Sequence, residues 1–466
     1  MATDKMTVVT PSGCIGNRGI DRDSFVDVLD REKPDVVAVD SGSLDCGPWY
    51  LGTGHAHSPM SNIQRDLDIV VTECVRRKIP FVTGSAGGSG ALPHVGIAAD
   101  AVRQIAAKRS LKFKMGLIYS DVDKDDLTRR LRDGVHMPRV PHEILGEPLT
   151  EKEVDGCTHI VAMMGAEPLI KALSDGADVV IAGRTSDCAV IGALPIMKGF
   201  DVGLSMHMGD IMECGENALV DVEGVTQRPG ANRTGIVGEI HKDFFIVRSG
   251  HPGMACTVDS ALAHSMYERE THDLVELPGG VLDKRETRFE TENERAVRIS
   301  GTKFQPRPYT VLLEGAGFEG WRSIAIQGVR NPRMISQIEA IVAHEKKSVE
   351  ALFGDLGAFS IYPHIYGRGA VLGPAELEGH RANAELCLIL DVVAESQRLA
   401  HDIAEDLALK IAFSRYEGRT TTAGNVAYLF SPNIIDGGQA FSTTIYHEMA
   451  VEDPLEICRF QYEDVT

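Results

Sequence analysis

The sequence predicts an α/β protein with a doubly wound, mostly parallel sheet in its N-terminal half and a smaller C-terminal α+β domain. Six short apolar runs recur through the first 190 positions, and each ends in glycine or small polar residues. Helical segments lie between them, and this alternation is typical of the α/β class. Strands that are apolar throughout are buried on both faces, as in parallel sheets. Ligands bind at the carboxyl ends of such strands, so we expect a site in the loops that follow.

The predicted strands and helices alternate along the chain. The six strands are 7–10, 35–39, 80–83, 114–119, 159–164 and 178–182. Amphipathic spacing and polar first turns predict helices over 21–33, 58–78, 91–109, 125–132, 167–174 and 188–198.

The pattern changes after about residue 200, where 238–248, 296–314 and 321–330 alternate apolar and polar residues. This period of two indicates antiparallel strands. The charge-dense stretch 283–298 is interpreted as a solvated face or loop. We therefore predict a Rossmann-like α/β domain over 1–334, with antiparallel additions, and a smaller α+β domain over 335–466.

Composition narrows the possible partners and the compartment. The 466 residues carry a net charge of -20, which argues against binding to a phosphate backbone. No apolar run reaches the roughly 18 residues that a membrane helix needs. The nine cysteines are scattered without a Cys-x-x-Cys pair, and the N-terminus lacks a signal-peptide core. We expect a cytoplasmic protein that binds neither nucleic acid nor membrane.

The glycine-rich loop over 84–90 is a candidate anion site. Its members Ser85, Gly87, Gly88 and Ser89 lie between a strand and a helix, where backbone N–H groups and the helix N-terminus favour an anion. The alternative is a tight turn. The loop lacks the lysine of a Walker A motif and the spacing of the dinucleotide fingerprint, and the chain shows no NAD or PLP signature.

Two arginines are candidates for binding a substrate carboxylate. Arg18 follows the first strand in a glycine-rich turn, and its guanidinium offers a planar fork, although a solvated side chain is the alternative. Arg184 follows the last parallel strand, together with Thr185, Ser186 and Asp187. Asp187 either pairs with Arg184 as a structural contact or orients it toward the substrate.

The densest polar loop contains Asp40, Asp45, His55 and His57. A His-x-His pair in an extended segment places both rings on one side. The pair then supplies two ligands of a divalent metal, with a carboxylate as the third, or a general base. The alternative is that one histidine caps the next helix and the other is solvated.

Glu213 lies in an apolar setting beside Ile211 and Met212, where burial would raise its pKa and suit it to act as an acid or base. The alternative is a buried glutamate paired with Arg184. Cys214 fits a small core residue better than a nucleophile, because no histidine lies near it in sequence.

Four stretches together resemble one known family. They are Asp-Ser-Gly-Ser-Leu-Asp-Cys-Gly-Pro-Trp-Tyr-Leu-Gly at 40–52, Gly-Ser-Ala-Gly-Gly-Ser-Gly at 84–90, Ile-Ala-Gly-Arg-Thr-Ser-Asp at 181–187 with Glu-Cys-Gly at 213–215, and Gly-Asn at 424–425 before Phe-Ser-Pro at 430–432. This combination resembles the acyclic terpene utilisation (AtuA) family over essentially the whole chain. The resemblance implies an α/β fold and cytoplasmic catabolism of small organic acids, and it makes Asn425 a candidate to complete the site.

These features favour an enzyme that acts on a small carboxylate or an acyl-CoA by proton transfer. A hydratase, dehydratase or isomerase fits, with His55, His57, Asp45 or Glu213 as acid or base. A metal-dependent hydrolase and a non-catalytic subunit of a catabolic complex remain alternatives. We expect a small anionic substrate and a homo-oligomer, with a small partner subunit as a further option.

Overall fold

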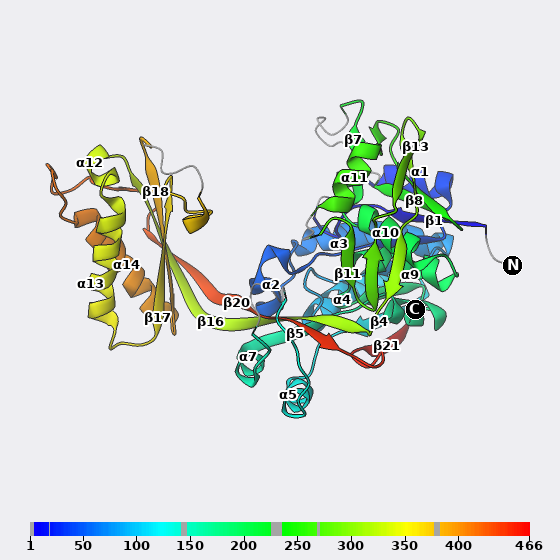
Figure 1. Ribbon diagram of the computed structural model, residues 1–466, viewed down its shortest axis with the longest axis horizontal. Helices are drawn as coiled ribbons and strands as arrows, with labels where there is room; N and C mark the ends of the chain where they lie inside the picture. Colours follow the sequence, from blue (N-terminus) through cyan, green and yellow to red (C-terminus); the bar gives the residue numbers. More distant parts are fainter. Residues whose placement is uncertain (1–3, 18, 141–146, 225–234, 268–270, 377–382) are drawn as a thin grey trace. The chain divides into compact units, whose positions relative to one another are not determined.

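The computed structural model describes residues 4–17, 19–140, 147–224, 235–267, 271–376 and 383–466 (Figure 1). The chain divides into two compact units. The first comprises Met1–Gly317 and Thr443–Thr466, and the second comprises Phe318–Ser442. Each unit is described by itself below. No helix in the described part of the chain has the length and apolar character needed to cross a bilayer.

The first unit is built around a ten-stranded sheet. Its centre consists of five parallel strands in the order β1 (Lys5–Thr10), β2 (Val36–Val39), β3 (Phe81–Thr83), β6 (Val179–Ala182) and β4 (Phe113–Tyr119). Antiparallel strands extend both edges: β8 (Ile236–His241), β9 (Phe244–Ser249), β14 (Ala296–Ser300) and β13 (Arg288–Asn293) beside β1, and β21 (Arg459–Val465) beside β4.

The α/β class is confirmed, but the prediction of a mostly parallel sheet is wrong. Half of the strands are antiparallel, and the predicted strand at 159–164 does not join this sheet. That segment, β5 (Cys157–Met163), pairs antiparallel with β16 (Thr310–Val329). The reason is its burial, because Thr158 is exposed whereas β2, β3 and β6 are buried at every position. The charge-dense stretch forms the exposed strand β13.

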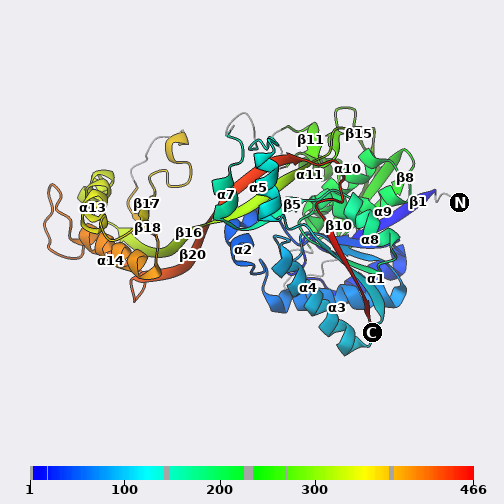
Figure 2. The same ribbon diagram turned by 90° about the horizontal axis from the view of Figure 1, so that it is seen from below.

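Helices cover both faces of the parallel strands, as Figure 2 shows. Alternate strand residues serve alternate faces because side chains in a strand point in opposite directions. Val37, Val39 and Phe81 pack with α1 (Arg22–Glu32), α3 (Met60–Arg77) and α4 (Leu92–Arg109). Val36, Ala38 and Val82 pack with α8 (Glu167–Ser174), α9 (Asp187–Met197) and α10 (Val202–Met212).

Smaller elements complete the first unit. The helices are η1 (Leu44–Cys46), α2 (Pro48–Thr53), α5 (Lys124–Arg132), α7 (Glu151–Gly156), η2 (Gly215–Ala218) and α11 (Val258–Met266). The strands β11 (Leu274–Leu277), β12 (Gly280–Asp283) and β15 (Lys303–Pro306) form one small sheet, and β7 (Val220–Asp221) pairs with β10 (Met254–Ala255).

The second unit packs helices against one antiparallel sheet. The sheet contains β17 (Phe359–Tyr366), β18 (Leu386–Ala394), the second part of β16 and β19 (Ala427–Tyr428), with β20 (Ile434–Ala450) paired to β16. The helical elements are α12 (Pro332–Ile335), α13 (Ile338–Phe353), η4 (Gly373–Ala375) and α14 (Gln397–Phe413), and α13 and α14 share a core with the sheet.

The structure divides the chain within strands rather than at a linker near residue 335. The second unit is not C-terminal, because residues 443–466 return to the first unit. Both β16 and β20 run continuously from one unit into the other. Glycines at 315, 317 and 320 lie at the boundary within β16, and Gly437 and Gly438 lie near it within β20, but the chain continues as strand through both positions instead of forming a loop.

Candidate functional site

Buried polar residues gather at the carboxyl end of the parallel strands. Asp40 directly follows β2, Ser85 lies just after β3, and Arg184 follows β6. Asp40, Ser85 and Arg184 are 5%, 0% and 6% exposed, respectively. The sequence therefore placed these loops at the correct edge of the sheet, and the edge is deeply buried where they meet.

Arg184 is held by protein groups on every nitrogen of its guanidinium. Nε donates to Glu314 Oε2 at 2.8 Å and Nη2 to Glu314 Oε1 at 3.3 Å. Nη1 donates to Ser85 Oγ at 3.1 Å, to the Thr185 carbonyl at 2.8 Å and to Asp187 Oδ1 at 3.2 Å. The pairing with Asp187 is present. The fork is thus engaged within the protein, and the role that its contacts support is to join β16 to the loops after β3 and β6.

Among the described residues, the acids around Arg184 outnumber the cation. Asp40, Asp187 and Glu314 each act on its charge. Asp40 Oδ2 accepts a hydrogen bond from the Gly42 amide at 2.7 Å, whereas its buried Oδ1 has no hydrogen-bond partner among the described residues. Burial, and then the charge of Asp187, hold the pKa of Asp40 well above its ordinary value of 3.8.

Asp187 is the most exposed of the carboxyls around Arg184. Its side chain is 34% exposed, while Arg184 beside it is nearly covered. Burial raises the pKa of Asp187 and outweighs the attraction of Arg184, and the charge of Asp45 adds to the rise. Two neighbouring carboxyls with raised pKa values tend to keep a proton between them. The edge of the sheet therefore holds two carboxyls with raised pKa values.

The backbone amides of the 84–90 loop are largely used inside the protein. The Ser85 amide donates to the Gly183 carbonyl at 2.8 Å, and the Gly88 amide donates to the Ser85 carbonyl at 2.9 Å. At the start of α4, the Leu92 amide donates to Asp121 Oδ1 at 2.9 Å. A carboxylate of the protein thus faces the helix N-terminus, where we predicted a substrate anion, and these contacts favour the tight-turn alternative.

The loop glycines allow close approach to neighbouring loops. Gly88 has a φ of +107°, and an added Cβ there would lie 2.6 Å from His57 Cβ. Gly90 has a φ of +69°, and an added Cβ would overlap the Arg184 backbone nitrogen. An added Cβ at Gly87 would lie 2.9 Å from His94 Cβ. Ser89 is buried. Between them, these residues fix the position of the acidic cluster rather than form an open cradle.

Ser85 carries backbone strain at this point. Its φ of +46° lies in the left-handed region that non-glycine residues rarely adopt. Its hydroxyl donates to the Thr185 carbonyl at 3.2 Å and accepts from Arg184, which holds the strained conformation in place. Strain of this kind is common at functional sites. Ser186, next along the chain, is buried at the start of α9 with its hydroxyl 3.4 Å from Cys188 Sγ.

The loop with two histidines does not form a metal site of three ligands. His55 is exposed and packs on Trp49 with ring centroids 5.1 Å apart, while His57 meets the Tyr50 ring at 5.1 Å. Asp45 is exposed and accepts a hydrogen bond from Ser43. Among the described residues, these side chains do not bring three metal-binding atoms together. Catalysis by His55, His57 or Asp45 stays a prediction.

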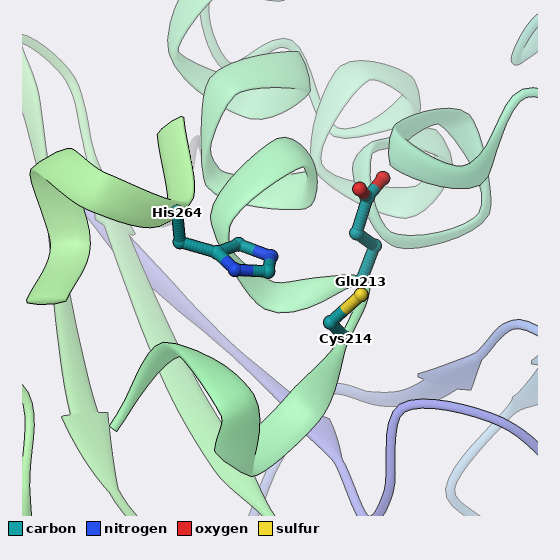
Figure 3. Close-up of side chains that lie close together, drawn as sticks. All are labelled: Glu213, Cys214 and His264. Carbon is teal, nitrogen blue, oxygen red and sulfur yellow. The ribbon is translucent and has the colours of Figure 1, made fainter. Parts of the chain in front are cut away.

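The alternative interpretation of Glu213, a pairing with Arg184, is wrong. Glu213 Oε1 accepts a hydrogen bond from the Tyr267 hydroxyl at 2.9 Å, and the glutamate that pairs with Arg184 is Glu314. Glu213 lies instead beside Cys214 and His264, as Figure 3 shows. Its role as an acid or base stays a prediction.

Two further predicted residues cannot be placed at the acidic cluster. Arg18 lies outside the described residues. Asn425 belongs to the second unit, where its Oδ1 accepts from the Tyr416 hydroxyl at 2.7 Å and from Thr421 at 3.3 Å. These contacts support a structural role for Asn425 within its own loop.

Sequence reasoning missed Glu314 and undervalued Asp40. Glu314 is 2% exposed and lies 130 positions from Arg184, so no local pattern links the two. Its only signal is a charged residue within the apolar run Leu312–Leu313 of β16. Asp40 was visible in the polar loop, and its place directly after a fully buried strand was the clue to its burial.

Comparison with known proteins identifies the family. The sequence matches the family described as acyclic terpene utilisation family protein AtuA over residues 8–429. The chain belongs to this family. No curated protein and no solved structure matches it. The match spans the residues of the acidic cluster, so Asp40, Arg184, Asp187 and Glu314 all lie within the family region.

Proposed function

We propose that the chain is an enzyme that adds or removes water, or moves a proton, on a small carboxylate or acyl-CoA substrate, with Asp40 and Asp187 as its acid–base pair. One observation carries this proposal. Asp40 is buried at the carboxyl end of the parallel strands, where the charge of Asp187 acts on it, with Oδ1 left without a hydrogen-bond partner among the described residues.

A carboxyl pair of this kind suits proton transfer. When two acids lie together in a buried place, one holds its proton near neutral pH while the other is ionised. The first then serves as a general acid and the second as a general base. Asp187 is the partly exposed member, so it is the group that a substrate would reach first. Hydration, dehydration and isomerisation need such transfers and no organic cofactor.

Arg184 supports the pair without binding substrate. Its charge lies between Asp187 and Glu314 and limits the repulsion among the acids. Because its donors already have acceptors, we expect the substrate's own acidic group to be bound elsewhere in the loops. Membership of a family named for acyclic terpene utilisation supports a catabolic role.

Proton exchange in heavy water tests the proposal directly. The purified chain is incubated with a panel of unsaturated acids, hydroxy acids and their CoA thioesters, and deuterium uptake beside the carbonyl is followed by NMR. We expect uptake on at least one member. Asp40→Asn and Asp187→Asn should each slow it by about 10²–10⁴-fold, the usual contribution of an acid or base.

The matched control is Asp27→Asn, which removes an exposed carboxylate on α1 that pairs with Arg31. It should leave exchange unchanged. Full exchange in folded Asp40→Asn and Asp187→Asn variants would refute the assignment of the pair. Exchange by the isolated chain would also contradict the alternative of a non-catalytic subunit.

A further inference from the structure

We infer that Glu213, Cys214 and His264 form a binding site for a divalent cation of the zinc type, separate from the acidic cluster. Glu213 caps the end of α10, Cys214 follows it, and His264 lies in the last turn of α11 (Figure 3). Among the described residues, this is the place where three metal-binding side chains come together.

The donor atoms have the identity and spacing that such a cation requires. One carboxylate oxygen, one thiol sulfur and one imidazole nitrogen lie within 4.8 Å of one another. Tetrahedral zinc holds these donors at about 2.0–2.3 Å, which places neighbouring ligand atoms about 3.3–3.8 Å apart. Side-chain movement of about 1 Å brings all three to one ion. The mixture of sulfur and nitrogen favours zinc over magnesium or calcium, which prefer oxygen.

The site is shielded from water. Glu213 is 7% exposed and His264 is 9% exposed. Cys214 is half-buried, so the three side chains are largely but not fully covered.

Tyr267 supports all three proposed ligands. Its hydroxyl lies 2.9 Å from Glu213 Oε1 and 3.0 Å from Cys214 Sγ, and its ring stacks on His264 with centroids 4.4 Å apart. Residues that orient the ligands of a metal in this way typically contribute as much as a tenfold to hundredfold gain in affinity.

The backbone of Cys214 is fixed by the loop after β1. An added Cβ at Gly13 would lie 2.6 Å from the Cys214 carbonyl oxygen, and one at Gly215 would lie 2.6 Å from the Gly13 amide nitrogen. Neither glycine tolerates a side chain without movement. The proposed ligands are thus held by rigid, closely packed backbone, and three protein ligands leave a further coordination position open.

Metal titration of the chelator-treated full chain tests the site. Calorimetry with Zn²⁺ should show one ion bound per chain. Cys214→Ser and His264→Gln should each weaken binding by at least about 100-fold, more than is typical for supporting residues, and Tyr267→Phe by about 10-fold. Cys46→Ser is the control, because Cys46 is an exposed thiol outside the group and should have no effect.

X-ray absorption of the zinc-loaded wild-type chain gives a second measurement that needs no variant. We expect one sulfur and one imidazole nitrogen among the ligands. A hydrogen-bonded cluster without a metal role predicts no stoichiometric binding, and that result would overturn the inference. So would binding that is lost in Cys46→Ser but retained in Cys214→Ser, or a ligand shell without sulfur. None of these outcomes depends on proton exchange at Asp40.

Discussion

Two buried ionic clusters of the first unit differ in their balance of charge. Around Lys284, the ammonium lies 3.2 Å from Asp210 Oδ2, with both side chains nearly covered. His207 completes this network through Thr302 at 2.7 Å and Ser265 at 2.8 Å, and burial lowers its pKa to about 3, so it is neutral. Among the described residues, one cation, Lys284, pairs with one carboxylate, Asp210. Around Arg184, three carboxyls meet one cation.

The difference separates a structural network from a candidate site. In the Lys284 network a buried cation and a carboxylate pair directly, and both ring nitrogens of His207 have partners, as buried polar groups usually do. In the acidic cluster an oxygen of Asp40 has no hydrogen-bond partner among the described residues, and two carboxyls have raised pKa values. Perturbed groups of this kind gather at functional sites. Buried charged residues alone do not indicate a functional site, whereas an excess of buried carboxyls over cations does.

The largest expected effect comes from the backbone that holds the acidic cluster. Gly90→Ala should destabilise the chain by at least about 4 kcal/mol, because the new methyl group overlaps the Arg184 backbone and the φ of +69° disfavours alanine. Urea unfolding measures the change. The control is Gly176→Ala, where φ is +86° but no atom lies within 4 Å, so only the backbone cost of about 1 kcal/mol remains. Equal losses in both variants would contradict close packing at Arg184.

His207, in the Lys284 network, should make the folded chain less stable in acid. Its pKa falls from 6.5 to about 3 on folding, so the unfolded chain binds a proton more readily and stability drops as pH falls below 6.5. The full loss is on the order of 4 kcal/mol. His207→Asn should flatten this acid limb in urea unfolding followed against pH. His55→Asn, at an exposed site, should leave the limb as it is, and an unchanged limb in both variants would refute the assignment.

Removing Lys284, the buried cation beside Asp210, should cost about 3 kcal/mol, since Lys284→Met breaks a buried ion pair. Chemical denaturation at neutral pH measures this. Lys303→Met removes an exposed ammonium paired with Glu286 and should change stability by under about 0.5 kcal/mol. A similarly small change in Lys284→Met would mean that the network tolerates imbalance.

The smallest expected effect comes from Asp40, whose contribution to stability depends on pH in the opposite direction to that of His207. The folded pKa of Asp40 lies above 3.8, so the folded chain binds this proton more tightly and stability falls as pH rises through that raised pKa. Asp40→Asn removes the loss, so its stability relative to wild type should grow as pH rises from about 4 through the raised pKa of Asp40. A stability difference that is constant across this range would show that Asp40 is ionised throughout.

Elements with a strong local signal could be predicted from the sequence. Strands β2, β3 and β6 are apolar at every position, and α1 starts at Asp21, whose side chain caps the helix. For β5 the apolar run was recognised, but not its partner. Pairing with β16 depends on residues 150 positions away, such as Leu312 opposite Met163.

For the candidate sites too, contacts between residues close in sequence could be predicted, whereas contacts between distant residues could not. Arg184 and Asp187 lie three positions apart, so their pairing could be read from the sequence. Glu314 reaches Arg184 only through the fold, and His264 reaches Cys214 in the same way. Local sequence specifies which residues carry charge, whereas tertiary packing decides which of them are left without a counterion.

The order of the strands has a consequence for how the chain is made. Strand β21, at residues 459–465, covers the edge of β4, at residues 113–119. A ribosome that has synthesised β4 must add more than three hundred residues before β21 emerges. Throughout that time the edge of β4 is open to any other strand. Full protection of the sheet in the first unit thus waits until the whole second unit has been translated.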